Sequence, residues 1–440
     1  MNSKTLCIVL ITAILLSLTG CASEQPAVSS PNEVNDEQMV ETNELNEPEI
    51  PENRVDLMQS IAAVEKEPEP ITPEATAAVS DFALQLFRAA NDSDQNTLIS
   101  PLSVLCALAM TANGAEEETL LQMESTLGMG RESYNEFFHS YLTALHSDAS
   151  SALKLANSIW FADRSDFVPE EDFLKTSAAC YGADAYLAPF DDSTVREINT
   201  WVSKKTDSMI PSILDQIPDE AVMYLVNALA FDAKWSQPYS DFDVNPGEFT
   251  AADGTKQTVD FMHSEEMDYL SDDNATGFIK YYLGRDYAFV ALLPNEGVSV
   301  DDYLDSLDGE KLQSLIENRS QETVITVTPK FETQTSLELS EVLKAMGMEL
   351  PFDGEQADFS SLGTSQAGNL SISSILHKTF ISVAEDGTRA GAVTAIAVEA
   401  ACEPEEEPKK VRLDRPFVYM LIDCETDLPF FIGTMLNPNE

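Results

Sequence analysis

The stretch from Glu385 to Cys402 reads EDGTRAGAVTAIAVEAAC and joins a strand-like run to an exposed, charged loop. Alternate residues from Thr388 onward are small or apolar, which is the two-residue period of a strand with one buried face. The same stretch is rich in alanine, which favours helix over strand. The pattern alone therefore leaves two interpretations open, a strand patterned for burial and a helix or flexible linker.

The segments around this stretch predict a mixed fold. Ser100 and Pro101 form a helix start, with a capping residue followed by a proline at the first helical position. Helices dominate the first half and strands the second, which predicts an α+β fold with largely antiparallel sheets. Residues 75–440 contain no proline-rich linker and no internal repeat, so we expect them to form one unit. The predicted helices span residues 75–90, 101–111, 116–127, 131–145 and 194–207, and the predicted strands span 153–161, 222–231, 288–293, 324–327, 372–384, 417–422 and 430–436.

Composition excludes several classes of protein. The chain has 440 residues, with 25 Lys and Arg against 76 Asp and Glu, and a formal net charge of −51. Apolar residues make up 43%, which is enough for a sizeable core and excludes wholesale disorder. So acidic a chain repels phosphates, which argues against nucleic-acid binding and predicts attraction to cationic partners.

The N-terminal 74 residues have the composition of a leader and a tether. Residues 1–20 combine a basic start, an apolar stretch too short to span a bilayer and small residues at the end, as in a signal peptide. Cys21 at that junction resembles the lipidated cysteine of bacterial lipoproteins, although an ordinary signal peptide is the alternative. Residues 21–74 are rich in acids and proline, which predicts an extended spacer. Within it, residues 55–64 could form a short helix, and we interpret them as a transient turn, with a docking element as the alternative. We expect an extracytoplasmic protein that touches the membrane only through its lipid.

Signatures of common enzymes and metal sites do not occur in the sequence. The cysteines lack zinc spacing, and there is no HExxH, GxGxxG, Walker or GxSxG motif. The four histidines are most simply structural or surface residues. We therefore expect no enzyme, no metal and no cofactor, and a hydrolase built from dispersed residues is the least favoured hypothesis.

The stretch that begins at Glu385 resembles the hinge and reactive-centre loop of serpins, the serine protease inhibitors. The hinge pattern is an acid, a Gly-Thr pair and a run of small residues, and it matches Glu385, Gly387, Thr388, Ala390, Gly391 and Ala392. Further serpin-like motifs follow in the family's order. They are ISPLS at 99–103, LVNALAF at 225–231 with Lys234 and Trp235, TPKF at 328–331, His377 with Lys378, RPFV at 415–418 and FIG at 431–433.

This resemblance covers residues 75–440 and implies a serpin-like fold. That fold has a large central, mostly antiparallel sheet, further sheets, about eight to nine helices and an exposed loop, here spanning about 385–412. The resemblance also implies a buried polar cluster called the shutter and a tryptophan at the breach, where the sheet opens. These structural positions fall on Ser100, Ser103, Asn227, His377 and, for the breach, Trp235.

What the resemblance implies for function is protease trapping. In serpins the protease attacks the exposed loop, and the cleaved loop then inserts into the central sheet as a new strand. Small inward residues near the hinge allow rapid insertion, and Thr388, Ala390, Ala392 and Thr394 satisfy this requirement. Arg389 and Val393 depart mildly from the family's pattern.

The usual spacing from the hinge acid in inhibitory serpins places the scissile bond between Ala401 and Cys402. Among the residues before this bond, Val398, Ala400 and Ala401 suit an elastase-like protease, whose shallow primary pocket takes small apolar side chains. Glu399 also belongs to the bait and is the less favoured alternative for the scissile residue. The acids of residues 403–407 would attract a cationic protease, unless they are simply a solvated loop.

Two functions thus remain from the sequence. The first is a monomeric, surface-anchored inhibitor of elastase-like serine proteases. The alternative is a non-inhibitory serpin that acts as a protease substrate or a binding module. Its expected mark, charged or bulky inward residues in the hinge, is absent from residues 388–394.

Overall fold

A seven-stranded sheet forms the centre of the computed structural model, which describes residues 53–61, 67–145, 151–163, 167–218, 221–366, 369–388 and 407–439. All of these belong to one compact unit, Ile50–Glu440. Its strand order is β1-β5-β3-β6-β15-β14-β12, and only the β3–β5 pair is parallel. In that order the strands are Val55–Asp56, Asp184–Ala188, Ser151–Ala162, Met223–Lys234, Gly387–Thr388, Leu376–Val383 and Phe331–Glu338.

A nine-stranded sheet packs beside it in the order β16-β11-β8-β9-β10-β17-β18-β2, with β7 beside β8. Strands β10 and β18 are buried along their whole length, so this sheet supplies much of the core. In that order the strands are Lys409–Arg412, Ser320–Pro329, Lys256–Ser271, Ala275–Tyr281, Tyr287–Pro294, Phe417–Asp423, Leu428–Met435 and Thr97–Ile99, with β7 at Val244–Thr250. A two-stranded sheet joins β4 (Val168–Pro169) to β13 (Gly363–Thr364).

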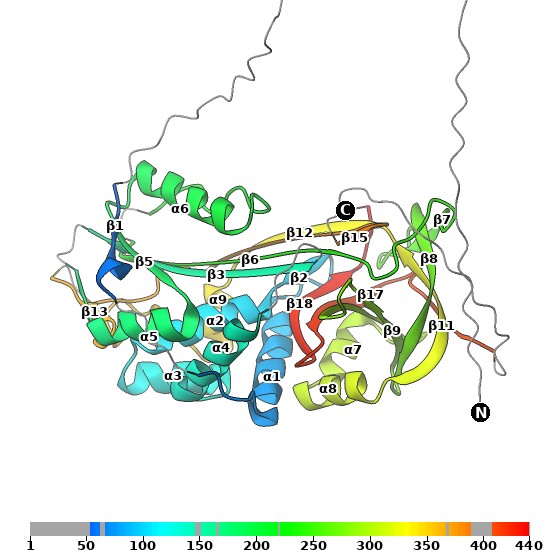
Figure 1. The fold of residues 1–440 in the computed structure, drawn as a ribbon, viewed down its shortest axis with the longest axis horizontal. Coiled ribbons are helices and arrows are strands. Elements are labelled where there is room, and N and C mark those ends of the chain that lie inside the picture. The colour runs from blue at the N-terminus through cyan, green and yellow to red at the C-terminus, as the bar shows by residue number, and fades with distance from the viewer. Residues whose placement is uncertain are drawn as a thin grey trace, which may run out of the picture. The chain divides into compact units, whose positions relative to one another are not determined.

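Helices cover both faces of the central sheet. Helix α6 lies on one face, and α2, α4 and α5 lie on the other (Figure 1). Helix α2 is buried at every position and forms the middle of the core. The α-helices of the described residues are α1 Pro73–Ala90, α2 Pro101–Ala112, α3 Glu117–Leu127, α4 Arg131–Ala144, α5 Glu171–Tyr181, α6 Asp192–Lys205, α7 Val300–Ser306, α8 Gly309–Glu317 and α9 Ser340–Ala345, and the 3-10 helices are η1 Leu57–Ser60 and η2 Leu350–Phe352.

Two apolar clusters hold these layers together. The larger lies between the two sheets and helices α1 to α5. A smaller cluster seals α6 onto the sheet, where Trp201 and Ile198 of the helix meet the aromatic residues Trp160, Tyr186 and Tyr224. Because all these side chains are at most 7% exposed, α6 is a packed layer of the fold.

The predicted α+β class with mainly antiparallel sheets is confirmed. One predicted strand, 372–384, is too long, because β14 begins at Leu376. Ile372 and Ile375 are buried but do not belong to a strand. Their apolar side chains therefore indicated burial and not strand structure. Strands β7, β8 and β9 were not predicted, although together they form the hairpins beside β10.

The acidic segment 21–74 was predicted to be an extended spacer, and its described residues are instead part of the folded unit. Strand β1 adds to the edge of the central sheet by pairing with β5. Four apolar residues of the segment, Leu57, Met58, Ile61 and Ile71, pack against the larger core cluster. Thr72 caps α1 by accepting the N–H of Ala75, so this helix begins at Pro73.

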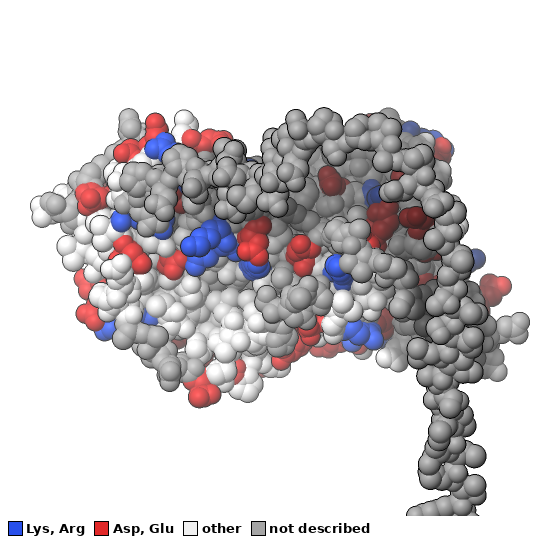
Figure 2. Space-filling model, turned by 45° about the horizontal axis from the view of Figure 1, so that its top comes forward, with Lys and Arg blue, Asp and Glu red and all other residues white. Residues whose placement is uncertain are grey.

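Charged side chains cover the surface unevenly. Acidic residues occur over much of the face in Figure 2, and a group of lysine and arginine side chains interrupts them near its middle. Within the described ranges, no helix has the length and apolar character needed to cross a bilayer.

Candidate functional site: the hinge and the gap in the central sheet

The hinge enters the central sheet as the short strand β15. Gly387 pairs with Lys234, and Thr388 pairs with Ala233 on β6 and with Val383 on β14. A side chain at Gly387 would place its Cβ 2.1 Å from the carbonyl oxygen of Ala233, so only glycine fits between the strands. The Thr388 side chain is 2% exposed and therefore faces inward.

Trp235 ties the turn before this strand to the sheet. Its indole Nε1 donates a hydrogen bond of 2.8 Å to the carbonyl oxygen of Ala384. Its backbone N–H donates to the carbonyl oxygen of Asp386 at 2.9 Å, and the N–H of Tyr239 donates to that of Glu385 at 3.0 Å. The sequence assigned Trp235 to the breach, and the structure places it directly against the hinge.

Lys280, on β9, was missed by sequence reasoning. Its side chain is buried and pairs with Glu266 at 2.7 Å. The ammonium lies 5.4 Å from the ring centroid of Trp235 and 4.3 Å from that of Tyr239, which are cation–π distances. Burial alone would lower the pKa of Lys280, but Tyr239 and Glu266 outweigh it and raise the pKa. A single lysine in a strand carries no sequence signal for such a role.

Glu385 forms an ion pair at the other side of the hinge. Its carboxylate lies 2.6 Å from the Nζ of Lys330, which immediately precedes β12. Partial burial opposes ionisation of Glu385, but the hydrogen bond and charge of Lys330 lower the pKa of its carboxyl on balance. The hinge acid of the sequence motif is therefore paired with the residue that precedes β12, the strand beside β14.

Beneath Thr388, the described residues supply no strand between β6 and β14. Strand β6 pairs with β3 along one edge, but its other edge pairs with β15 only at Ala233 and Lys234. Strand β14 pairs with β12 and, through Val383, with β15, and no register joins β6 to β14 in the described residues. A cavity of about 20 Å³ lies below Thr388, lined by residues 229–231 of β6 and 380–382 of β14.

The segment after α6 lies over this gap. Met209 and Ile210 line the cavity below Thr388, and together with Pro211 they also line a groove of about 510 Å³ over β12 and β14. The groove's floor includes Phe380, which is 38% exposed. A strand that continued downward from Thr388 would run beneath residues 209–211.

The predicted shutter residues fall into two groups. In the first group, the backbone N–H of Ser100 donates to Nε2 of His377 at 2.9 Å, and the hydroxyl of Ser103 donates to the carbonyl of Ser100 at 3.1 Å. Burial lowers the pKa of His377 to about 4, so its ring is neutral near pH 7 and accepts this bond. Ser100 occupies the cap position of α2, but its hydroxyl makes no capping bond and has no partner in the described part of the chain.

The second group centres on Asn227 and on Asn157 of β3. The amide of Asn227 donates to the side-chain oxygen of Asn157. Asn157 in turn donates to the carbonyl of Tyr181 at 3.2 Å and to the sulfur of Cys106 at 3.3 Å. Sequence reasoning missed Asn157, since a buried polar residue inside a predicted strand has no distinguishing pattern.

The remaining site predictions lie outside the described residues. These are the distal hinge residues, the bait residues, the predicted scissile bond and the lipidation site, namely Ala390, Gly391, Ala392, Thr394, Val398, Glu399, Ala400, Ala401, Cys402 and Cys21. The chain is described again from Glu407, and Lys409–Arg412 forms β16, parallel to β11. Lys409 and Lys410 were predicted in an exposed loop. They remain exposed, but the burial of Val411 holds their segment in a strand.

Comparison with known proteins agrees with this architecture. A family model described as serpin (serine protease inhibitor) matches residues 77–438. An uncharacterized serpin-like protein of Thermococcus kodakarensis is 31% identical over 372 residues, which cover 82% of this chain and 85% of that protein. Leukocyte elastase inhibitor A of Mus musculus is 30% identical over 389 residues, covering 83% of this chain and all of the inhibitor.

A solved structure extends the agreement to three dimensions. The crystal structure of the thermophilic serpin tengpin in its native state has a TM-score of 0.84 and 45% identity, and it covers 88% of this chain and 100% of that chain. The latent-state structure of tengpin gives a TM-score of 0.75 at 44% identity, covering 84% of this chain and 100% of that one. With nearly the whole folded unit matched by the family model, this chain belongs to the serpin family of serine protease inhibitors.

Proposed function

We propose that this chain is a suicide-type inhibitor of elastase-like serine proteases. Serpins are generally protease inhibitors rather than enzymes, and the proposal adds a mechanism and a target class. A protease would cleave the loop and form an acyl-enzyme, and the freed loop would then insert between β6 and β14 before the ester hydrolyses. The acyl-enzyme would be trapped because insertion carries the protease away from its productive geometry.

The observation that carries this proposal is the position of Thr388. It already lies between β6 and β14 with its side chain buried, and no pairing joins these two strands in the described part of the chain. Because side chains alternate along a strand, Ala390, Ala392 and Thr394 would share the inward face of Thr388 as the strand lengthens. All three are small, so the sheet could close around them without a large or charged group to bury.

An elastase-like target is favoured by the small residues before the proposed scissile bond, Ala401–Cys402. A relative that shares 30% identity is named leukocyte elastase inhibitor A, which fits this target class. The net charge of −51 would speed encounter with a cationic protease. We further propose that the protein acts as a monomer outside the cytoplasm, held to a membrane through lipid on Cys21.

The experiment is to mix the full-length protein with an excess of an elastase and to analyse it by denaturing electrophoresis and intact-mass measurement. We expect a covalent complex and a released peptide that begins at Cys402. Complete cleavage with the elastase still active would overturn the inhibitor proposal in favour of a protease substrate.

A matched pair of hinge variants tests insertion itself. Thr388→Arg places a charge at a buried position of the growing strand, so it should raise the amount of protein needed per elastase inhibited several-fold. Arg389→Glu changes the charge at the next position, which alternation directs outward, and should inhibit like the wild type. Equal inhibition by both variants and the wild type would contradict loop insertion. The lipid anchor is tested separately, because Cys21→Ser should release the protein from the membrane fraction without altering inhibition.

A further inference from the structure

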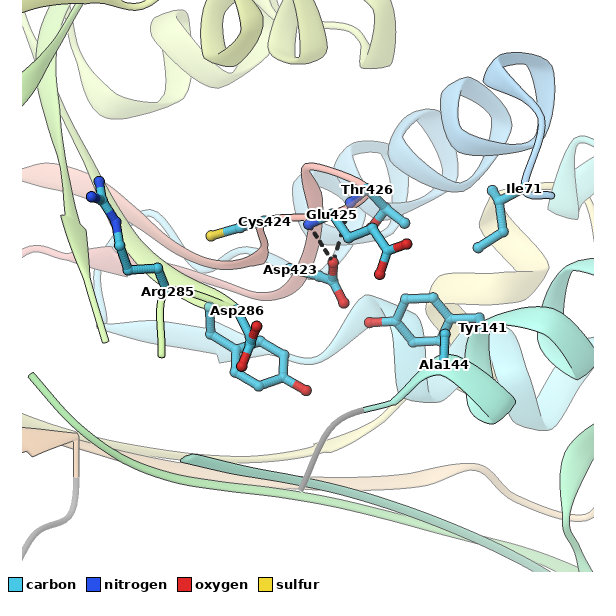
Figure 3. A pocket seen from close by; sticks show the side chains of 10 residues that line it. Ile71, Tyr141, Ala144, Arg285, Asp286, Asp423, Cys424, Glu425 and Thr426 are labelled. Carbon is cyan, nitrogen blue, oxygen red and sulfur yellow. Dashed lines mark hydrogen bonds between the residues drawn. The ribbon is translucent and has the colours of Figure 1, made fainter. Parts of the chain in front are cut away.

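A cavity of about 250 Å³ lies between the end of α4 and two turns of the nine-stranded sheet. One turn joins β9 to β10 and the other joins β17 to β18 (Figure 3). The lining includes three carboxyl groups, those of Asp286, Asp423 and Glu425. It also includes the apolar side chains of Ile71 and Ala144. The residues that line this cavity differ from those that line the cavity below Thr388.

Tyr141 of α4 points its hydroxyl into this cavity. Figure 3 shows the phenol directed toward the carboxylate of Asp423. The residue is only 2% exposed, and its hydroxyl makes no hydrogen bond of ordinary geometry in the described part of the chain, although the Asp423 carboxylate is near enough to interact with it. Burial, followed by the charge of Asp423, raises the pKa of Tyr141, so the phenol keeps its proton. A buried hydroxyl without a hydrogen bond of ordinary geometry is costly, and a ligand could supply one.

Asp423 lies at the end of β17, and its carboxylate faces Tyr141 (Figure 3). One carboxylate oxygen accepts the N–H groups of Glu425 at 2.9 Å and Thr426 at 3.2 Å. Burial is the main influence on it and raises its pKa, the hydrogen bonds from Glu425 and Thr426 act in the opposite direction, and the charge of Glu425 raises it further. Arg285 also lines the cavity, but its guanidinium carbon lies 4.0 Å from the ring centroid of Tyr281 and the side chain extends away from Asp423 (Figure 3).

We propose that this cavity binds a small aliphatic diamine. One ammonium group would lie between Asp423 and the Tyr141 hydroxyl, and the second would approach Asp286 or Glu425. The methylene chain would pack on Ile71 and Ala144. The cavity is smaller than the sites that hold drug-sized ligands, which fits a ligand of few heavy atoms. In the described residues, no three His, Cys, Asp or Glu side chains are placed to hold a metal ion, so the carboxylates suit an organic cation better.

Isothermal titration calorimetry of the full-length protein with 1,4-diaminobutane, at 150 mM salt, tests this site. We expect saturable binding of one equivalent. Asp423→Asn removes the charge that pairs with the ammonium and should weaken binding about tenfold or more. Tyr141→Phe keeps the ring and removes only the hydroxyl, so it provides a milder variant that should also weaken binding several-fold. Circular dichroism checks that each variant is folded.

Three controls separate a built site from general attraction to an acidic protein. Asp273→Asn makes the same change of charge at an exposed position outside the cavity and should leave the affinity unchanged. Butylamine, with one charge, should bind more weakly than 1,4-diaminobutane, and 1,4-butanediol should not bind. The proposal fails if no saturable binding is seen, if butylamine binds equally well, or if Asp273→Asn weakens binding as much as Asp423→Asn.

Discussion

The hydroxyl of Tyr282 and the Oγ1 of Thr388 lie 2.5 Å apart in the interior of the protein. Tyr282 also stacks on Trp235 with ring centroids 4.4 Å apart and an interplanar angle of 11°. Trp235 in turn binds the backbone of the turn that leads to Thr388. The innermost hinge residue is therefore fastened to an aromatic pair in the core, and this attachment defines where strand insertion would begin.

This hydrogen bond can be measured by a double-mutant cycle. Tyr282→Phe and Thr388→Val each leave the other hydroxyl buried without its partner, so each should lower the free energy of unfolding by about 1–2 kcal/mol. The double variant should lose little more than either single variant, because neither hydroxyl then remains unpaired. Urea unfolding followed by tryptophan fluorescence gives the comparison. Tyr281→Phe, which loses a different bond to Asp268, is the control and should be additive with Thr388→Val.

Much of this site could be predicted because its motifs are local. Gly387, Thr388 and Trp235 belong to short sequence patterns, and each lies at the point where the hinge enters the sheet. Position 387 requires glycine because β6 approaches its backbone closely. Resemblance to the hinge motif identifies this glycine before the structure is known.

The parts that could not be predicted depend on pairing between distant segments. Lys280 and Asn157 acquire their roles only when β9 and β3 lie beside the breach and the shutter, and neither residue differs in sequence from an ordinary strand residue. Arg54 belongs to a segment whose acidic, proline-rich composition predicts no fold, yet backbone pairing, a few apolar residues and Arg54 itself hold it on the edge of the central sheet. The composition of the whole segment is an average, so it does not identify the few residues that contact the central sheet.

The ion pair between Lys330 and Glu385 should make hinge stability depend on pH. Glu385 has a lowered pKa in the folded protein, so the stabilisation is present above its ordinary pKa of 4.5 and is lost as the pH falls through the lower folded value. The two side chains are 35% and 31% exposed, so the contribution is at most about 1 kcal/mol. Lys330→Met should remove it, and the difference from wild type should shrink at acidic pH.

Hydrogen exchange of the Tyr239 amide, which donates to Glu385, reports on the hinge directly. Exchange should be faster in Lys330→Met at pH 7 and similar in both proteins at acidic pH. Lys344→Met breaks the exposed pair with Glu341 on α9 and should leave this amide unchanged. A pH-independent difference between wild type and Lys330→Met would contradict the ion-pair explanation.

His377 should destabilise the protein as the pH falls. Its pKa is about 4 in the folded state, because of burial, against 6.5 for an exposed histidine. Below pH 6.5 the histidine of the unfolded chain binds a proton, whereas that of the folded protein stays neutral until about pH 4. The free energy of unfolding therefore falls by up to about 3 kcal/mol over that interval. His377→Gln keeps an acceptor for the Ser100 N–H but does not titrate. Its stability relative to wild type, measured by urea unfolding, should improve from pH 7 to pH 4.5, and a constant difference would exclude this role.

Arg54 anchors the N-terminal strand through a buried carboxylate. Its guanidinium carbon lies 4.4 Å from the ring centroid of Tyr186 and 5.5 Å from that of Trp160, and its NH1 is 4.0 Å from Oε2 of Glu197. The Glu197 side chain is 3% exposed, so Arg54→Ala leaves a buried negative charge poorly compensated.

We expect Arg54→Ala to lower the free energy of unfolding by about 2–3 kcal/mol, since it also removes the stacking of the guanidinium on two aromatic rings. Thermal unfolding measured by circular dichroism gives the comparison. Arg54→Lys keeps the charge but loses the planar stacking, so its midpoint should fall between those of Arg54→Ala and wild type. Arg196→Ala, an exposed arginine on α6 one residue before Glu197, is the matched control. If Arg54→Ala unfolds at the same temperature as Arg196→Ala, the N-terminal strand is held by its backbone pairing with β5 and by its apolar residues, and not by this arginine.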